Sequence, residues 1–414
     1  MIKNGAVGAW LAALLLAAVA GPCGAATFSM KRGISLDNWV TWPREARWSD
    51  PSVLLPFPEW RRSLGPSGLE ALKAAGFDFV RMPVDPAPLM SPATEAYRER
   101  LFAEVLDAVR LVNAAGLKVV VDLHLIPFGD ERSVGMEKVM ADPAMFDHYL
   151  DLVRTVARTL SREDPERVAL ELMNEPVTGC EGAEAADWQE RLTRLFAAAR
   201  ASATRLTLVL SGGCWGSAEG LAAVDPRAVP DDNVLWSFHS YAPFLLTHQG
   251  ASWAGDFIGY VEGLSYPPDA ASPDERDAAL EAVRARIRAE APLTRRAGLL
   301  AYLDEQVAEI DTPGKLRATM AAPFETVAAW AGKYGVARKD VLLGEFGMIS
   351  REYGENHAMP GRWRAAYARD MIALAEEHGF GWALWSYGGA FGIVEAFDGE
   401  EAAPDVLDMV RSLK

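Results

Sequence analysis

The stretch Leu170-Glu171-Leu172-Met173-Asn174-Glu175-Pro176 is an apolar, strand-like run that ends on a carboxylate. The run Val341-Leu342-Leu343-Gly344-Glu345-Phe346-Gly347 repeats this arrangement later in the 414-residue chain. A carboxylate at the end of a buried strand is poorly solvated, so it is usually either paired with a cation or catalytic. Both stretches therefore predict a buried strand with a chemically significant residue at its carboxyl end.

Strand-like runs of this kind occur eight times in the chain, and segments with helical spacing of apolar residues lie between them. The runs cover residues 33–36, 77–83, 118–124, 168–174, 206–211, 234–239, 341–346 and 381–386, and the clearest helical patterns cover residues 68–75, 97–115, 143–160 and 185–203. Gly76 and Gly116 follow two of these patterns, where a glycine is typical of a helix end.

Eight alternating strands and helices are compatible with a parallel barrel or with a doubly wound open sheet. No Gly-rich dinucleotide fingerprint follows the first strand, and polar residues gather at the strand ends. We therefore expect a single (β/α)₈ barrel, the TIM barrel, whose chemistry lies at the carboxyl ends of its strands.

The alternation is interrupted once, after the sixth strand. Residues 242–321 show no strand pattern, only Pro-rich turns and a highly charged helical segment over residues 274–289. Long insertions in a barrel are usually functional loops or lids. We expect this one to form a wall of the cleft.

The first 26 residues have the pattern of a secretory signal peptide: Lys3, an apolar run, and small residues before Thr27. The apolar run is too short for a confident membrane span. Cys23 raises the alternative of a lipid anchor, but Pro22 precedes it where a lipoprotein signal has a small residue. We expect residues 27–414 to form one mature domain that is exported to the periplasm or the medium and is not anchored in a membrane.

The composition favours a globular, acidic protein. Hydrophobic residues make up 50% of the chain and charged residues 24%, and the formal net charge is −16 at pH 7. Such a charge repels phosphate backbones and anionic lipid surfaces, so nucleic acid is not an expected partner. Neutral polysaccharide suits this charge better than a polyanionic polymer does.

Two cysteines remain after removal of the signal peptide. Cys180 follows the Asn174-Glu175-Pro176 turn, and Cys214 lies in Ser211-Gly212-Gly213-Cys214-Trp215. An even pair in an exported protein is a disulfide candidate. Two separate buried thiols are the alternative.

The strand ends together carry a set of polar and aromatic residues. They include Arg81, His124, Asn174, Glu175, His239, Tyr241, Glu345 and Trp385. Two carboxyl groups at one rim are what cleavage of a glycosidic bond requires, since one protonates the departing oxygen and the other attacks or assists at the anomeric carbon.

This set, together with the opening motif Arg32-Gly33-Ile34-Ser35-Leu36-Asp37-Asn38-Trp39, resembles glycoside hydrolase family 5, the cellulase-type retaining β-glycosidases of clan A. The resemblance covers essentially the whole mature chain. It implies that Glu175 is the acid/base, that Glu345 is the nucleophile, and that the reaction is a double displacement that needs no cofactor or metal.

The resemblance also implies a role for each remaining residue. Arg81 would lie beside Glu345 and favour its ionised form, Tyr241 would touch Glu345, and His239 would lie near Glu175. The negative charge of Glu345 would contribute to a raised pKa of Glu175. The sugar would be bound by Asn174 at its 2-hydroxyl, by His124, and by Trp385 as a flat apolar platform.

Some residues permit a structural or a functional interpretation. Taken singly, a Glu-Pro pair is usually a helix start, a Gly-Glu-Phe-Gly sequence a turn, and His124 or Trp385 a core residue. We interpret Glu171 as structural, because strand alternation faces it differently from Asn174. Three aromatic residues are interpreted either as sugar platforms at outer subsites or as packing residues: Phe128, Trp215 and Trp253.

The sequence lacks the motifs of zinc hydrolysis, acyl transfer and ATP chemistry. The sequence contains no His-Glu-x-x-His, Cys-x-x-Cys, Gly-x-Ser-x-Gly or Walker motif, and His148, His248, His357 and His378 are too scattered to suggest a metal cluster. The favoured substrate is a β-1,4-glucan, cleaved by a monomer. Mannan, β-1,3-glucan, transglycosylation and a non-catalytic carbohydrate-binding barrel are the alternatives.

Overall fold

The computed structural model describes residues 26–42, 44–54, 64–126, 132–352, 358–395 and 402–413. Residues 1–25 of the expected signal peptide and the candidate platform Phe128 lie outside these ranges. Within them, none of the helices combines the length and the apolar character needed to cross a membrane.

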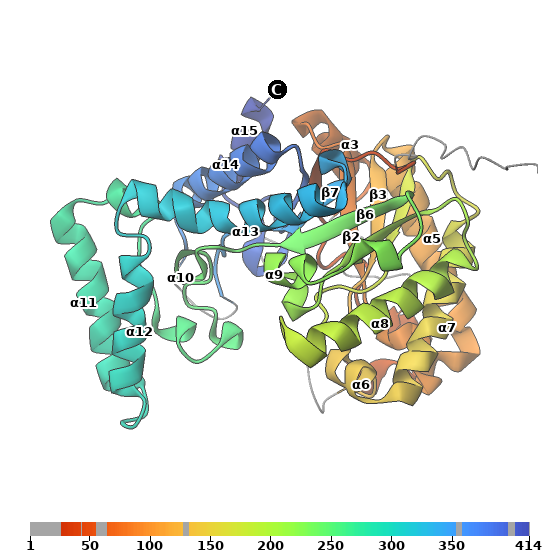
Figure 1. Ribbon diagram of the computed structural model, residues 1–414, viewed down its shortest axis with the longest axis horizontal. Coiled ribbons are helices and arrows are strands. Elements are labelled where there is room, and N and C mark those ends of the chain that lie inside the picture. Colours follow the sequence, from red (N-terminus) through yellow and green to blue (C-terminus); the bar gives the residue numbers. More distant parts are fainter. Residues whose placement is uncertain are drawn as a thin grey trace, which may run out of the picture.

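Eight parallel strands close into a barrel in sequence order, which confirms the predicted (β/α)₈ architecture (Figure 1). The last strand pairs with the first, so the sheet has no free edge. The strands are β1 (Arg32–Ser35), β2 (Phe79–Val84), β3 (Lys118–Leu123), β4 (Val168–Glu171), β5 (Thr207–Ser211), β6 (Val234–His239), β7 (Val341–Glu345) and β8 (Gly381–Leu384).

A helix follows each strand and covers the outside of the barrel. The main helices are α3 (Pro66–Ala75), α5 (Arg98–Ala114), α7 (Pro143–Leu160), α8 (Gly182–Arg200), α9 (Ala218–Ala222), α13 (Pro313–Tyr334), α14 (Gly361–His378) and α15 (Asp405–Ser412), with the short helices α1 (Pro51–Leu54), α4 (Ala87–Met90) and α6 (Met136–Ala141) between them. Gly76 and Gly116 have φ values of 115° and 82°, the left-handed conformation expected of a glycine at a helix end.

The barrel interior has two layers. Near the amino ends of the strands, one apolar residue from each of β2 to β8 packs against Phe28 and Met30, which precede β1: Phe79, Val120, Ala169, Val209, Leu235, Leu342 and Ala383. Two residues further along the same strands, the interior is polar, with Arg81, Asp122, Glu171, Ser211 and Ser237 all buried. This period of two places the polar layer directly below the rim at which the strands end.

The insertion after β6 is wholly described and contains helices and no strand, as expected. The predicted charged helix is α11 (Pro273–Glu290). Helices α10 (Phe244–Thr247) and α12 (Arg296–Ala308) were not predicted from the sequence, and α13 begins within the insertion. Helices α11 and α12 stand side by side at one end of the molecule, beyond α10 (Figure 1). A cavity of about 510 Å³ between α11 and the start of α14 has neither Glu175 nor Glu345 in its lining.

Several strands end earlier than the sequence pattern suggests. Strand β4 stops at Glu171 rather than at residue 174, so the Asn174-Glu175-Pro176 segment is a loop. The pairing of β6 with β7 shifts between Phe238 and His239, which brings His239 opposite Glu345. Both departures occur at the rim, where side chains are aimed by irregular backbone rather than by sheet alternation.

A substitution at Gly33 tests how tightly the apolar interior layer near the amino ends of the strands is packed. A Cβ atom at this position would lie 2.3 Å from Cζ of the Phe79 ring, which is fully buried. We expect Gly33→Ala to lower the free energy of unfolding by about 1–3 kcal/mol, because the added methyl group would overlap the buried ring and force it to shift. Urea denaturation measures the change.

Gly332, in the exposed part of α13, is the matched control. No atom lies within 4 Å of a Cβ there. Gly332→Ala should raise the stability by up to about 1 kcal/mol, because alanine is the better helix former. If both substitutions changed the stability by the same amount and sign, the packing argument for Gly33 would be wrong.

Candidate active site

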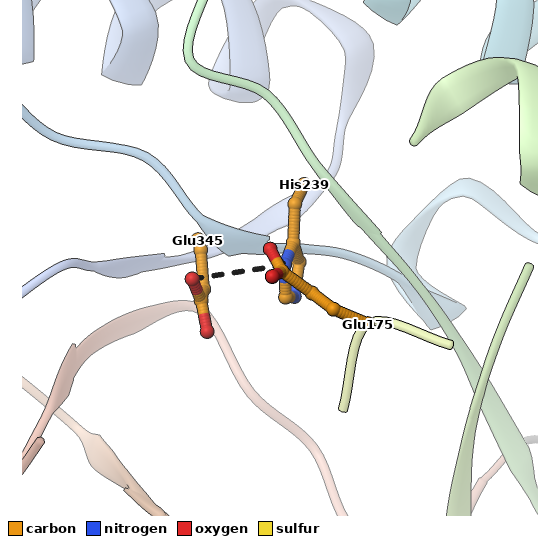
Figure 2. Close-up of side chains that lie close together, drawn as sticks. All are labelled: Glu175, His239 and Glu345. Atoms are coloured by element: carbon orange, nitrogen blue, oxygen red, sulfur yellow. Dashed lines mark hydrogen bonds and ion pairs between the residues drawn. The ribbon is translucent and has the colours of Figure 1, made fainter. Parts of the chain in front are cut away.

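The two predicted catalytic carboxylates meet at the carboxyl-terminal rim of the barrel. Glu345 is the last residue of β7 and is buried, and Glu175 follows β4 with a left-handed φ of 37°. One oxygen of each carboxylate and Nδ1 of His239 all lie within 4.8 Å of one another (Figure 2). The side chain of Glu175 is 26% exposed, whereas that of Glu345 is 5% exposed.

A single buried guanidinium organises the polar layer beneath these carboxylates. Arg81 is fully buried, and its Nη1 donates to Oε1 of Glu345 at 2.6 Å. Its remaining nitrogens contact Oδ1 of Asn174 at 2.7 Å, Oε2 of Glu171 at 2.7 Å and Oδ2 of Asp122 at 3.0 Å. Arg81 therefore lies beside Glu345, as expected, but it is shared with two further acids.

The expectation that Glu171 faces away from Asn174 was wrong. Glu171 and Asn174 do not face different ways, since both accept hydrogen bonds from Arg81. The alternation rule fails because β4 ends at Glu171 and the chain then turns. Burial raises the pKa of Glu171 to about 7, although Arg81 opposes this rise.

Asp122 is a member of the site that the sequence analysis missed. It is fully buried within β3, and it contacts both Arg81 and Nδ1 of His124, at 3.0 and 2.9 Å. Burial raises its pKa, but the charge of Arg81 and the hydrogen bond with His124 outweigh this, so the net shift is downward. Its signal was present: an aspartate inside the run Val119-Val120-Val121-Asp122-Leu123 must find a partner when the strand is buried.

His239 is the partner of Glu175. Its Nδ1 lies 2.8 Å from Oε1 of Glu175 and 3.7 Å from Oε2 of Glu345. Burial lowers the pKa of His239 to about 4, so the imidazole is neutral at physiological pH. Burial also raises the pKa of Glu175 to about 7, partly offset by the positive charges of His124 and Arg81. Burial, rather than the charge of Glu345, is thus the main cause of this rise.

Tyr241 completes the environment of Glu345. Its hydroxyl donates to Oε2 of Glu345 at 2.8 Å, while Arg81 binds Oε1. Burial, followed by the charges of Glu345 and Glu175, raises the pKa of Tyr241 far above its usual range. Each oxygen of Glu345 therefore has one fixed donor, which sets the orientation of the carboxylate.

His124 and Trp385 pack against each other beside Asn174. Their rings stack with centroids 5.7 Å apart and an interplanar angle of 17°. Nε2 of His124 lies 3.2 Å from Nδ2 of Asn174. Burial lowers the pKa of His124, but the hydrogen bond and charge of Asp122 reverse this and raise it overall.

Asp37 at the rim also escaped the sequence analysis as a member of this region. It accepts a hydrogen bond from the backbone N–H of Gly388, at 3.0 Å, and one from the side-chain amide of Asn38, at 2.8 Å. Burial raises its pKa to about 6. Asp37 thereby ties the end of β1 to the loop that carries Trp385.

Two loops beside Glu175 are joined by a disulfide between Cys180 and Cys214, whose Cα atoms are 4.7 Å apart. Next to Cys214, Trp215 is 48% exposed, and Trp253 in the insertion is 53% exposed. Trp253 and Phe244 pack around His248, whose ring contacts Tyr241. Both tryptophans therefore lie near the rim, and their roles stay predictions.

Within the described ranges, Glu175, His239 and Glu345 form the group with a geometry suited to a metal ion. One hydrogen bond joins His239 to Glu175, and another joins Tyr241 to Glu345. A neutral histidine, an acid of raised pKa and a carboxylate beside a cation form a set for proton transfer and nucleophilic attack.

Comparison with known proteins identifies relatives of this chain. Residues 60–391 match the family model described as Cellulase (glycosyl hydrolase family 5). The chain is 24% identical over 240 residues to endoglucanase C of Acetivibrio thermocellus, covering 58% of this chain and 65% of that protein. It is 28% identical over 191 residues to cellodextrinase A of Ruminococcus flavefaciens, covering 44% of this chain and 53% of that protein. The chain thus spans between half and two thirds of these relatives' length.

Solved structures of Cel5A from Thermotoga maritima, with cellobiose and with mannotriose, share the fold with a TM-score of 0.63. Their sequence identity to this chain is 19%, over 92% of this chain and 97% of theirs. The family model covers most of the chain, including every strand from β2 to β8. The chain therefore belongs to glycosyl hydrolase family 5.

Proposed function

We propose that this protein is a retaining β-glycoside hydrolase that cleaves β-1,4-linked glucan, with Glu345 as nucleophile and Glu175 as acid/base. The observation that carries the proposal is the approach of the two carboxylates, whose nearest oxygens lie within 4.8 Å of each other. This oxygen-to-oxygen approach supports a retaining enzyme, whose carboxyl groups stand about 5–5.5 Å apart, over an inverting enzyme, whose carboxyl groups stand about 6.5–9.5 Å apart to admit a water.

The unequal environments of the two carboxylates support the division of roles. Glu345 accepts from a buried arginine and a tyrosine, both of which stabilise a negative charge. Among the described residues, the hydrogen-bond partner of Glu175 is the neutral His239, and burial raises the pKa of Glu175 to about 7. Near neutral pH, one group is suited to attack and the other to carry a proton.

The reaction follows from these positions. Glu345 attacks the anomeric carbon while Glu175 donates its proton to the departing oxygen, which leaves a sugar covalently bound to Glu345. Glu175, now ionised, removes a proton from water, and that water displaces Glu345 with net retention. Asn174 would bind the 2-hydroxyl, and Trp385, stacked on His124, would pack against the sugar ring.

Glucan is proposed as the substrate because the curated relatives bear the names endoglucanase and cellodextrinase. Cel5A of Thermotoga maritima binds both cellobiose and mannotriose, so mannan is the second candidate. We propose that the protein acts as a monomer.

The substitutions Glu345→Gln and Glu175→Gln test the assignment of these residues as nucleophile and acid/base. Reducing-sugar release is measured on carboxymethylcellulose, mixed-linkage glucan, glucomannan, galactomannan and laminarin. We expect the wild-type protein to cleave carboxymethylcellulose. Glu345→Gln should lose about 10⁴-fold or more in kcat, since the nucleophile is removed, and Glu175→Gln about 10²–10⁴-fold.

Glu305→Gln, an exposed change on α12, is the control and should leave the activity unchanged. Cleavage of galactomannan in place of carboxymethylcellulose would move the assignment to mannan, and cleavage of laminarin alone would move it to β-1,3-glucan. Binding of a polymer without any cleavage would support the non-catalytic barrel and contradict the catalytic assignment.

The pKa of Glu175, raised to about 7, predicts the alkaline limb of the pH profile. The acid must be protonated for the first step, so kcat/KM on a polymer should fall about tenfold per pH unit above about pH 7. A dinitrophenyl cellobioside should not show this fall in kcat/KM, because its leaving group departs without a proton. An identical alkaline limb for both substrates would contradict the role of Glu175.

We also propose that the protein is exported and that its signal peptide is removed before Thr27. The disulfide between Cys180 and Cys214 is consistent with an oxidising compartment. Amino-terminal sequencing of the protein recovered from the periplasm or the medium should begin at Thr27. A mature chain that begins at a lipidated Cys23 would instead support a membrane anchor.

A further inference from the structure

Strained backbone is concentrated beside the acid/base. In the part of the chain that the structure describes, the residues other than glycine with a positive φ are Glu175 (37°), Cys214 (53°) and Trp215 (57°). Such conformations are unfavourable for these residues and persist only where the surrounding structure enforces them. All three lie in two neighbouring loops, one after β4 and one after β5.

Several contacts hold these two loops together. The disulfide between Cys180 and Cys214 joins residues 34 positions apart in the sequence. The backbone N–H of Trp215 donates to the carbonyl of Pro176, and that of Cys214 donates to Oγ1 of Thr178, both at 3.1 Å. These contacts bind the segment that follows Glu175 to the segment around Trp215.

The second loop also packs against the acid/base itself. A Cβ atom on Gly216 would lie 3.7 Å from Cγ of Glu175 and 3.7 Å from the ring of His239. Gly216 therefore forms part of the surface on which the Glu175 side chain and its histidine partner rest. A shift of the Cys214 loop would be transmitted to Glu175 both through Pro176 and through this surface.

We propose that the Cys180–Cys214 disulfide positions Glu175 for proton transfer to the leaving oxygen. The inference rests on the proposed function and adds to it a positioning pair outside the carboxylate centre. The disulfide keeps the two loops in register, and this register maintains the strained backbone of Glu175. Without the bond, the loop can relax and the carboxyl group moves away from the glycosidic oxygen.

The leaving group of the substrate distinguishes a misplaced acid from a loss of protein stability. A phenolate needs a proton in order to depart, whereas a dinitrophenolate does not. Misplacement of Glu175 therefore slows cleavage of phenyl cellobioside and spares dinitrophenyl cellobioside when kcat/KM, which reports the first step, is compared. Partial unfolding lowers the active fraction and reduces both values equally.

The test is the double variant Cys180→Ala/Cys214→Ala, assayed on both aryl cellobiosides at a temperature where it is folded. We expect kcat/KM to fall at least about 10-fold on phenyl cellobioside and less than about 2-fold on the dinitrophenyl substrate. Glu175→Gln gives the largest expected split between the substrates. Gly33→Ala, which destabilises the barrel far from the rim, should show no split.

Thr178→Val is a second variant that keeps the disulfide and removes one bond between the loops. It should show the same split at a smaller size, about 3-fold, and it decides the matter if the cysteine variant does not fold. Equal losses on both substrates in an active protein would refute the positioning role alone. A wild-type protein inactive on both substrates would refute the proposed function, and this inference with it.

Discussion

The site is built around one buried positive charge. Arg81 contacts Asp122, Glu171 and Glu345 as well as the amide of Asn174, and all of these residues are buried. Loss of one partner from such a buried pair costs about 3–5 kcal/mol, because the remaining charge is left without compensation. A single cation cannot neutralise three carboxylates. The opposite pKa shifts of Asp122 and Glu171 reflect this, since the first stays ionised and the second holds a proton up to about pH 7.

The position of Arg81 also makes the environments of Glu175 and Glu345 different. Glu345 belongs to the arginine cluster through Oε1, whereas Glu175 is bonded to a neutral histidine and lies outside that cluster. Two chemically identical side chains thereby have different hydrogen-bond partners although they lie only a few ångströms apart. The buried end of β7 places Glu345 in contact with Arg81, whereas the loop after β4 holds Glu175 at the rim.

The fold could be predicted from the sequence because each strand is an apolar run that is followed by a helix, and polar or aromatic residues gather at or just after most strand ends. The contacts of Arg81, His239 and Tyr241 with the two carboxylates could be expected from the family resemblance, because its motifs place them on particular strands. What could not be predicted depends on irregular backbone. Glu171 was misplaced because β4 ends before the alternation reaches Asn174, and the opposition of His239 to Glu345 depends on a register shift. The packing of α11 against α12 involves an insertion whose pattern carries little information on tertiary contacts.

The closure of the barrel links the two ends of the described chain. Strand β1 pairs with β8, and Phe28 packs in the same interior cluster as Ala383. The interior therefore cannot be completed during synthesis until residue 384 has left the ribosome, although most of the strands are available long before. A nascent chain of this topology remains open along one seam for nearly its whole length. That open state exposes an unpaired strand edge to chaperones and to aggregation until the last strand arrives.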